Sequence, residues 1–259
     1  MMPVLSFDIE TIPDCAGLIQ VLGLAADTPH EHVAEIAFQN RRKNTGSDFL
    51  QPYLQRIVAI SCALRDRDGL RVWTLGDETE SEAQLIHRFF DGLNRFTPQL
   101  ISWNGSGFDL PVLVQRGLIH GVAAHRFWDQ GEDDRDFKWN NYLSRYHTRH
   151  LDLMDVLSLY QGRALAPLDD MAKLCGFPGK LGMDGSQVWP AFRQGKLKEI
   201  RDYCETDAAN TYLLFLRYQL MRGAMTQKAY EEEMALVKET LGASDETHWK
   251  EFMAAWKSD

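Results

Sequence analysis

The stretch FDIETIP, residues 7–13, places two acidic side chains after an apolar run that predicts a buried strand over residues 4–9. Asp8 and Glu10 are two residues apart, so in a strand both side chains point to the same side. Neighbouring carboxylates repel each other, and their burial is costly without a positive partner. A metal ion or an arginine could compensate them, and exposure to open water is the remaining alternative.

Length and composition indicate a globular α/β protein. The 259 residues are 44% hydrophobic and 25% charged, enough for one large domain or a domain with a helical appendage. No apolar run is long enough to cross a bilayer, and the N-terminus lacks a signal-peptide pattern, so no membrane partner is expected. Four cysteines without CxxC spacing are typical of buried free thiols and favour a cytoplasmic location. The net charge of −9 argues against a surface coated with basic residues for long nucleic acid, but it is compatible with a local site.

The hydrophobic pattern along the chain predicts a mixed sheet with helices on its faces. Two β-branched runs joined by a link containing Asp68-Gly69 predict a hairpin. The predicted strands are 4–9, 57–64, 71–75 and 100–103, with a short strand or turn opening 150–160. The predicted helices are 80–95, one beginning at Asp109, one completing 150–160, 196–221 and two amphipathic helices in 226–259. Residues 14–56 are interpreted as an insertion with one or two helices, and residues 129–149 as a loop.

A second acidic position follows the strand that ends at Trp103. A glycine-bearing turn begins with Asn104, and Asp109 lies at the start of the next helix. Aspartate is a favoured helix N-cap, so capping is the simpler interpretation of Asp109 taken alone.

A third acidic position lies in the long helix near the C-terminus. Tyr203 and Asp207 are four residues apart, so they share one helix face, and that face is otherwise mostly apolar. We therefore expect Asp207 to point inward, where it needs a positive partner. An internal salt bridge to Arg201 or Arg217 is the alternative to a functional role.

Together these positions suggest a metal site. Asp8, Glu10, Asp109 and Asp207 each lie at a strand end, a helix start or an inward helix face. All-carboxylate sites select hard cations such as Mg²⁺ or Mn²⁺. Two such ions about 3.5–4 Å apart can clamp both oxygens of an in-line phosphoryl displacement.

On these motifs the chain resembles the DEDD superfamily of 3′-5′ exonucleases. The first motif is Asp8-Ile9-Glu10-Thr11, the second runs from Asn104 to Pro111, and the third is Tyr203-Cys204-Glu205-Thr206-Asp207. The chain is most similar to the proofreading exonuclease domain of family B DNA polymerases, and more closely to bacterial proteins described as predicted PolB-like 3′-5′ exonucleases. Asp202 stands where the histidine branch would have its histidine, so Tyr203 indicates the tyrosine branch, DEDDy. Gly107 departs from the polymerases, which usually have asparagine there.

The resemblance implies a ribonuclease H-like fold, a mixed five-stranded sheet flanked by helices, in which residues 1–222 form the exonuclease domain and 223–259 a C-terminal helical extension. It implies a metal-dependent enzyme, with two Mg²⁺ or Mn²⁺ ions, that releases nucleoside 5′-monophosphates from the 3′ end of single-stranded or frayed DNA, with DNA preferred over RNA. By the same resemblance Asp8, Glu10 and Asp207 would hold one metal, Asp8 would bridge to the second with help from Asp109 through water, and Tyr203 would orient the attacking water.

The candidate substrate contacts are Thr11, Ile12, Asn104, Phe108, His150 and Lys180. Thr11 and Ile12 could pack on the terminal nucleotide, Lys180 could reach a phosphate, and Phe108 could be either a stacking platform or a core aromatic. The basic run Arg41-Arg42-Lys43 could touch the phosphate backbone, although a solvated charge run is the simpler interpretation. His30-x-His32 and His147-x-x-His150 are not joined by a second ligand pair at zinc-site spacing.

Two other functions remain open from the sequence. An exoribonuclease of the same fold would differ only in substrate, and no sensor for a 2′-OH can be identified. A non-catalytic nucleic-acid-binding module would keep the fold without activity. The presence of all four acids and the tyrosine favours the enzyme.

Overall fold

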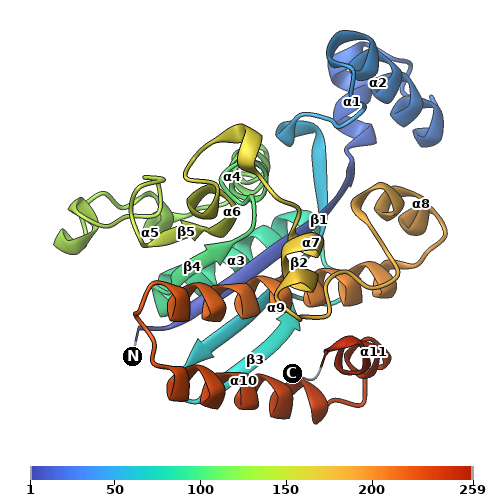
Figure 1. The fold of residues 1–259 in the computed structure, drawn as a ribbon. Helices are drawn as coiled ribbons and strands as arrows, with labels where there is room; N and C mark the ends of the chain where they lie inside the picture. Colours follow the sequence, from blue (N-terminus) through green and yellow to red (C-terminus); the bar gives the residue numbers. More distant parts are fainter. Residues whose placement is uncertain (1, 258–259) are drawn as a thin grey trace.

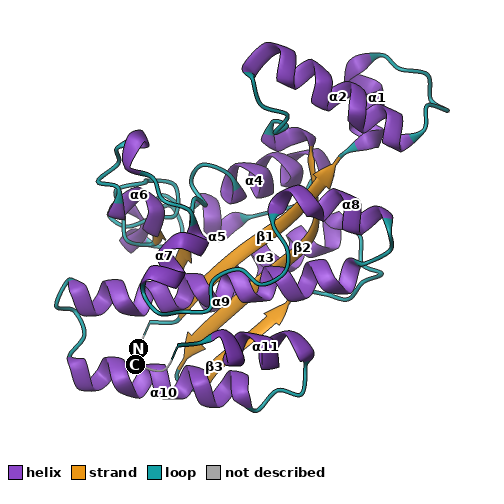
Figure 2. Ribbon diagram, turned by 45° about the vertical axis from the view of Figure 1, so that its right-hand side comes forward, coloured by secondary structure: helices purple, strands orange, loops and turns teal. Residues whose placement is uncertain are grey.

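A computed structural model describes residues 2–257 of the chain, so residue 1 and residues 258–259, at the outer ends of the two predicted domain ranges, lie outside the described part. Its centre is a five-stranded mixed sheet (Figures 1 and 2). The strands are β1 (Val4–Pro13), β2 (Gln55–Asp66), β3 (Gly69–Thr74), β4 (Gln99–Ser102) and β5 (His150–Asp152).

The sheet has the order β3-β2-β1-β4-β5, with β1 in the middle. Strands β1, β2 and β3 are antiparallel neighbours, and β4 and β5 run parallel to β1. The predicted hairpin is therefore β2–β3, and the predicted first strand is four residues too short. Pairing with Gln55–Ile57 of β2 carries β1 past a register shift between Glu10 and Thr11, so Asp8 and Glu10 lie within the strand rather than at its end.

Helices cover both faces of the sheet. On one face α3 and α4 pack over Leu5, Phe7 and Ile9 of β1. On the other face the long helix α9 crosses β1 and β2, with α7 beside it (Figure 2). The helices of this body are α3 (Glu82–Phe96), α4 (Asp109–His120), α5 (His125–Trp128), α6 (Leu153–Leu157), α7 (Leu168–Leu174), α8 (Val188–Arg193) and α9 (Leu197–Met221).

The segment between β1 and β2 forms a helical pair that stands at one end of β1, away from the centre of the sheet (Figure 1). It contains α1 (Cys15–Leu22) and α2 (His30–Thr45), which enclose a small apolar core of their own. The side chain of Arg116, on α4, ties down both ends of this segment. Its guanidinium pairs with Asp14 at 2.6 Å, donates to the Tyr53 carbonyl at 3.0 Å, and pairs with Glu82 at 2.6 Å. The insertion is thereby fixed to the helix whose N-terminus holds Asp109.

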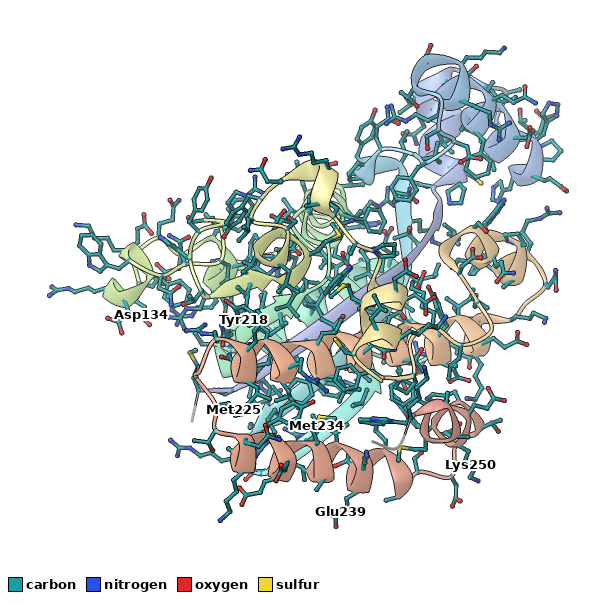
Figure 3. The ribbon with its side chains drawn as sticks, viewed as in Figure 1. Asp134, Tyr218, Met225, Met234, Glu239 and Lys250 are labelled. Atoms are coloured by element: carbon teal, nitrogen blue, oxygen red, sulfur yellow. The ribbon has the colours of Figure 1, made fainter. Side chains whose placement is uncertain are left out.

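The C-terminal segment forms the two predicted amphipathic helices, α10 (Gln227–Gly242) and α11 (Thr247–Ala255). They join the apolar cluster of α9 through Trp249 and Phe252, among others. In Figure 3 the side chains of Met225 and Met234 lie between α10 and the rest of the body, whereas Glu239 is on the exposed side. The tail is thus packed onto the domain by one face of each helix.

The segment predicted as a loop, residues 129–149, contains a 3₁₀ turn over Arg135–Lys138 and directly follows the unpredicted helix α5. Helices this short show too few apolar repeats to be recognised from periodicity. Among residues 2–257, none of the helices combines the length and the hydropathy needed to span a bilayer.

Candidate active site

The alternation of side chains along β1 places the two acids of the first motif under α9. Ser6 faces α9 as well, since its hydroxyl donates to the Ala208 carbonyl at 2.9 Å. The Cys204 thiol, also on α9, donates to the backbone carbonyl of Asp8 at 3.3 Å and lies 3.6 Å from its carboxylate. Glu10, two residues on, is buried with 7% of its surface exposed. The sequence argument that Asp8 and Glu10 share one side of the strand agrees with this arrangement.

Asp109 meets the same strand from α4. Its Oδ1 accepts a hydrogen bond from the backbone N–H of Ile9 at 3.2 Å, between the two acids of the first motif. The capping interpretation is wrong, because the N-cap position belongs to Phe108 and Asp109 is the first helical residue. Its carboxylate is turned toward β1 and is buried.

The turn that leads to Asp109 is held from β5. Asp152 accepts hydrogen bonds from the backbone N–H groups of Asn104 at 2.9 Å and Ser106 at 2.8 Å. Asn104 adopts a left-handed backbone conformation, with φ of 66°. A side chain at Gly105 would place its Cβ 2.2 Å from the Ser102 hydroxyl, so only glycine fits this turn. Asp152 is a positioning residue that the motif alone did not reveal.

The third motif lies on the inner face of α9, where Tyr203 and Asp207 are both buried. The predicted arginine partners are wrong: Arg201 donates to the Gly76 carbonyl at 2.6 Å, and Arg217 donates to the Tyr230 hydroxyl at 2.9 Å. Asp207 instead pairs with the Lys180 ammonium at 2.6 Å.

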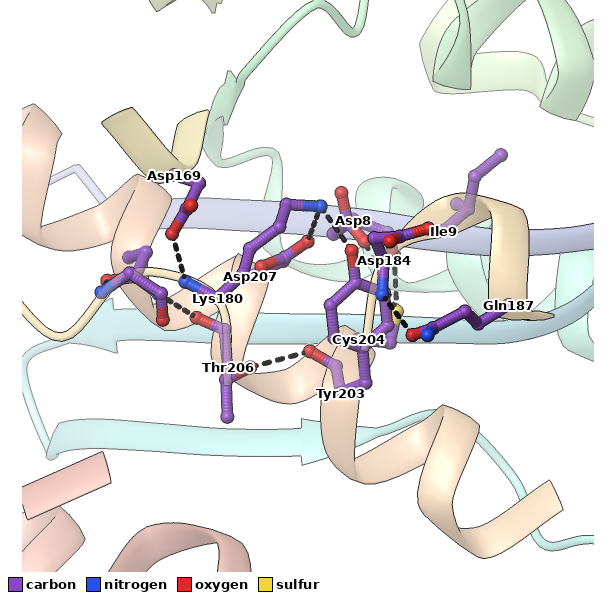
Figure 4. Close-up of polar contacts among 12 residues, drawn as sticks. Asp8, Ile9, Asp169, Lys180, Asp184, Gln187, Tyr203, Cys204, Thr206 and Asp207 are labelled. Atoms are coloured by element: carbon purple, nitrogen blue, oxygen red, sulfur yellow. Dashed lines mark hydrogen bonds and ion pairs between the residues drawn. The ribbon is translucent and has the colours of Figure 1, made fainter. Parts of the chain in front are cut away.

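Lys180 reaches the carboxylates from the loop before α8 (Figure 4). Its ammonium also hydrogen-bonds the Tyr203 hydroxyl and lies 4.8 Å from the centre of the Tyr203 ring. The loop is fastened by Asn210, whose side chain donates to the Gly179 carbonyl at 2.9 Å and accepts from the Gly179 N–H at 3.2 Å. Asp169 accepts from the Lys180 N–H at 2.8 Å, and a Cβ at Gly179 would meet that carboxylate at 2.5 Å. Glycine at 179, with φ of 71°, therefore lets the lysine enter the site.

The electrostatics of the site show that the four carboxylates form one cluster. Burial, and then the charges of Asp207, Asp109 and Glu10, raise the pKa of Asp8 well above its usual value. Burial followed by the charge of Asp207 does the same to the pKa of Glu10. Burial raises the pKa of Asp109 to about 7. Against these acids stands Lys180; burial alone would lower its pKa, but the charges of Asp207 and Asp8 raise it overall.

The donor set fits hard divalent cations. If all four carboxylates were ionised, the single Lys180 ammonium would leave a charge of −3, and the raised pKa values of Asp8, Glu10 and Asp109 reflect this excess of negative charge. Ligand atoms of Asp8, Glu10 and Cys204 all lie within 4.8 Å of one another. The Oδ1 atom of Asp207 is buried and has no hydrogen-bond partner among the described residues. An orphaned, buried carboxylate oxygen at this point is explained by a cation that it would coordinate.

The predicted substrate contacts differ in how far they are exposed at the site. The Thr11 hydroxyl donates to the Gln55 side chain at 3.0 Å, at the half-buried edge of the site. Ile12 is only 2% exposed and packs in a cluster with Tyr203 and Val58, so it offers no surface to a nucleotide. The expectation for Ile12 fails because the strand continues beyond Glu10, so its side chain returns to the core.

His150 is also buried, and its Nε2 lies 2.8 Å from the Ser102 hydroxyl beneath the second motif. This contact supports the glycine turn of the second motif. Phe108 is half-buried, and its ring contacts Phe49 from the insertion. Neither Phe49 nor Cys204 carries a sequence signal of its own, since both depend on contacts between distant segments.

The acids of the site come from β1, α4 and α9 and meet at the central strand of a mixed sheet. The chain is therefore an α/β protein with a carboxylate-lined site. The profile of the family described as "Predicted 3'-5' exonuclease related to the exonuclease domain of PolB" matches residues 47–256. The chain belongs to this family.

Weaker similarities extend to DNA polymerases. The chain is 24% identical over 145 residues to a catalytic subunit of DNA polymerase epsilon from Schizosaccharomyces pombe, which covers 53% of the chain and 6% of the polymerase. It is 22% identical over 167 residues to a DNA polymerase of Archaeoglobus fulgidus, covering 63% of the chain and 20% of that protein. The chain thus spans a small fraction of each of these relatives.

The fold is similar to part of the family B DNA polymerase of Pyrobaculum calidifontis. The TM-score is 0.51 at 17% sequence identity, with 98% of this chain and 28% of the polymerase chain covered. The predicted relationship to PolB-like exonucleases and the predicted α/β fold of the ribonuclease H-like class are confirmed.

Proposed function

We propose that the protein is a metal-dependent 3′-5′ exonuclease that hydrolyses single-stranded or frayed DNA and releases nucleoside 5′-monophosphates. The observation that carries the proposal is the excess negative charge of four clustered carboxylates, of which Glu10, Asp109 and Asp207 are buried, compensated by one lysine. Two divalent cations, Mg²⁺ or Mn²⁺, would supply the missing positive charge and polarise the phosphate and the attacking water. Family membership supports the direction and class of the reaction.

In this proposal Asp8, Glu10 and Asp207 would hold the cations, and Asp109 would help from the start of α4. Tyr203 orients the attacking water through its hydroxyl. Burial and the charge of Asp207 raise the pKa of this phenol, so it keeps its proton and is a poor general base. Lys180, which lies between Asp207 and Tyr203, donates to an oxygen of the scissile phosphate.

We assign residues 1–222 to the exonuclease domain, with 14–56 as its insertion and 223–259 as a C-terminal extension packed on α9. DNA is proposed as the preferred substrate over RNA. Four unpaired cysteines suit a reducing compartment such as the cytoplasm.

The test incubates the pure protein with 5′-end-labelled single-stranded DNA or RNA in Mg²⁺, Mn²⁺ or EDTA. We expect a ladder that shortens from the 3′ end with either metal, DNA degraded faster than RNA, and no cleavage in EDTA. Asp8→Ala should abolish cleavage without unfolding the protein, whereas the matched control Glu199→Gln, at an exposed acid of the same helix as Asp207, should retain it. Cleavage that persists in EDTA, or in Asp8→Ala, would refute the proposal.

A further inference from the structure

The insertion delivers an exposed aromatic side chain to the second motif. Phe49 follows α2 and is 57% exposed, yet its ring centre lies 5.2 Å from that of Phe108, with the rings tilted by 56°. Phe108 directly precedes Asp109, whose carboxylate is bonded to the backbone of Ile9. Two rings from distant segments therefore meet one residue away from the carboxylate cluster.

Hydrogen bonds and an ion pair within its loop hold Phe49 in this exposed position. Its carbonyl accepts from Arg41 Nε at 2.9 Å, and its N–H donates to the Ser47 hydroxyl at 3.2 Å. Arg42 pairs with Asp48 at 2.9 Å, and Leu50, the next residue along, is buried in the insertion core. The two arginines singled out in the sequence thus hold this loop.

The position of the loop relative to the catalytic carboxylates is also fixed. Arg116 lies two turns along α4 from Asp109 and is 2% exposed. It binds Asp14 at the start of the insertion and the Tyr53 carbonyl near its end. A ring carried on this loop keeps a set distance from the N-terminus of α4.

The net charge of the chain suggests a role for this pair of rings. Nucleic-acid binding proteins usually draw affinity from phosphate contacts, but this chain has a net charge of −9, and Arg41 and Arg42 are engaged in the loop. Stacking on aromatic rings is the other general source of affinity for single strands. Resting on the proposed function, we propose that Phe49 and Phe108 together form a base-stacking platform for the single-stranded 3′ end, with Phe49 contributed by the insertion.

The platform is tested by Phe49→Ala against labelled oligo(dT), with binding followed by fluorescence anisotropy in EDTA and cleavage followed with Mn²⁺. Loss of one stacked base predicts a roughly 5- to 150-fold weaker affinity and a raised KM. The kcat should be unchanged, because the rings bind the strand and do not touch the reacting phosphate. Phe49→Trp should bind oligo(dT) as tightly as the unmodified protein does, whereas Phe49→Leu should bind as weakly as Phe49→Ala.

The matched control is Phe96→Ala, which removes an exposed ring that lies beside Leu64 and Trp73 in a different surface hollow. It should bind as the unmodified protein does, and all variants should keep the Tm because the rings are exposed. Unchanged binding by Phe49→Ala, or equal rescue by leucine and tryptophan, would overturn the platform. If the unmodified protein binds oligo(dT) through Phe49 but does not cleave it, the platform stands and the proposed nuclease activity falls.

Discussion

Replacing Asp109 by asparagine should stabilise the metal-free protein while it removes activity. Burial raises the pKa of Asp109 from 3.8 to about 7, so above pH 7 the folded protein carries an ionised carboxylate that it disfavours. That difference corresponds to about 4 kcal/mol in the free energy of unfolding. Asparagine has the same shape, and its side-chain oxygen can still accept from the Ile9 N–H. The variant should therefore lose the penalty and keep the contact.

The sign of the pH dependence follows from the raised pKa. Above pH 7 both folded and unfolded chains are ionised at this residue, and the penalty is fully present. As the pH falls through 7 toward 3.8, the folded protein holds a proton that the unfolded chain lacks, so the penalty disappears. The advantage of the variant should fall from about 4 kcal/mol at pH 8 to about 2 kcal/mol at pH 5.

The assay is thermal unfolding in EDTA at pH 8, 6.5 and 5. For a domain of this size about 4 kcal/mol raises the Tm by roughly 10 °C. Added Mn²⁺ should raise the Tm of the unmodified protein more than that of the variant, because the cation relieves the same repulsion. Asp91→Asn, at a half-exposed acid of α3 that lies 3.9 Å from Arg95, is the control and should shift the Tm little. A variant that is not stabilised at pH 8, or whose gain grows toward pH 5, would refute the reasoning.

Two further predictions concern residues that support the site. Tyr203→Phe should lower the single-turnover rate by about 10²–10³-fold while the Mn²⁺-induced rise in Tm stays unchanged, and a full rate would assign Tyr203 to packing alone. Burial lowers the pKa of His150 from 6.5 to about 4, so the unfolded chain takes up a proton first and stability is lost as the pH falls below 6.5. In urea unfolding, the free energy of unfolding of His150→Gln should fall by about 2 kcal/mol less between pH 7 and pH 5 than that of the unmodified protein. Parallel pH dependence in both proteins would contradict this account of His150.

The acids could be predicted from the sequence because each rests on a local pattern. The two-residue spacing of Asp8 and Glu10 fixes a common side of any strand, and the four-residue spacing of Tyr203 and Asp207 fixes a common helix face. The length of β1, in contrast, could not be predicted from a local pattern. The final residues of β1 are held by pairing with β2 across the whole insertion, and no pattern within FDIETIP records that partner.

The partner of Asp207 could not be predicted for the same reason. Arg201 lies on the same helix and within two turns of Asp207, but its guanidinium reaches the carbonyl of Gly76. Lys180 arrives from 27 positions earlier because Asn210 and Asp169 hold its loop in place. Ion-pair partners in a core are chosen by which backbone segment is held nearby, and proximity in sequence carries little of that information.

The basic run of the insertion shows how tertiary contacts decide between two interpretations. From the sequence, Arg41-Arg42-Lys43 could be a phosphate contact or a solvated charge run. In the structure Arg41 donates to the Phe49 carbonyl and Arg42 pairs with Asp48, so both arginines contact the loop that carries Phe49. An acidic protein that uses its arginines to hold a ring in place should bind single strands with a weak salt dependence, because few counterions are released on binding. Its affinity should then depend on how many bases can stack, which makes strand length, more than ionic strength, the variable that separates good substrates from poor ones.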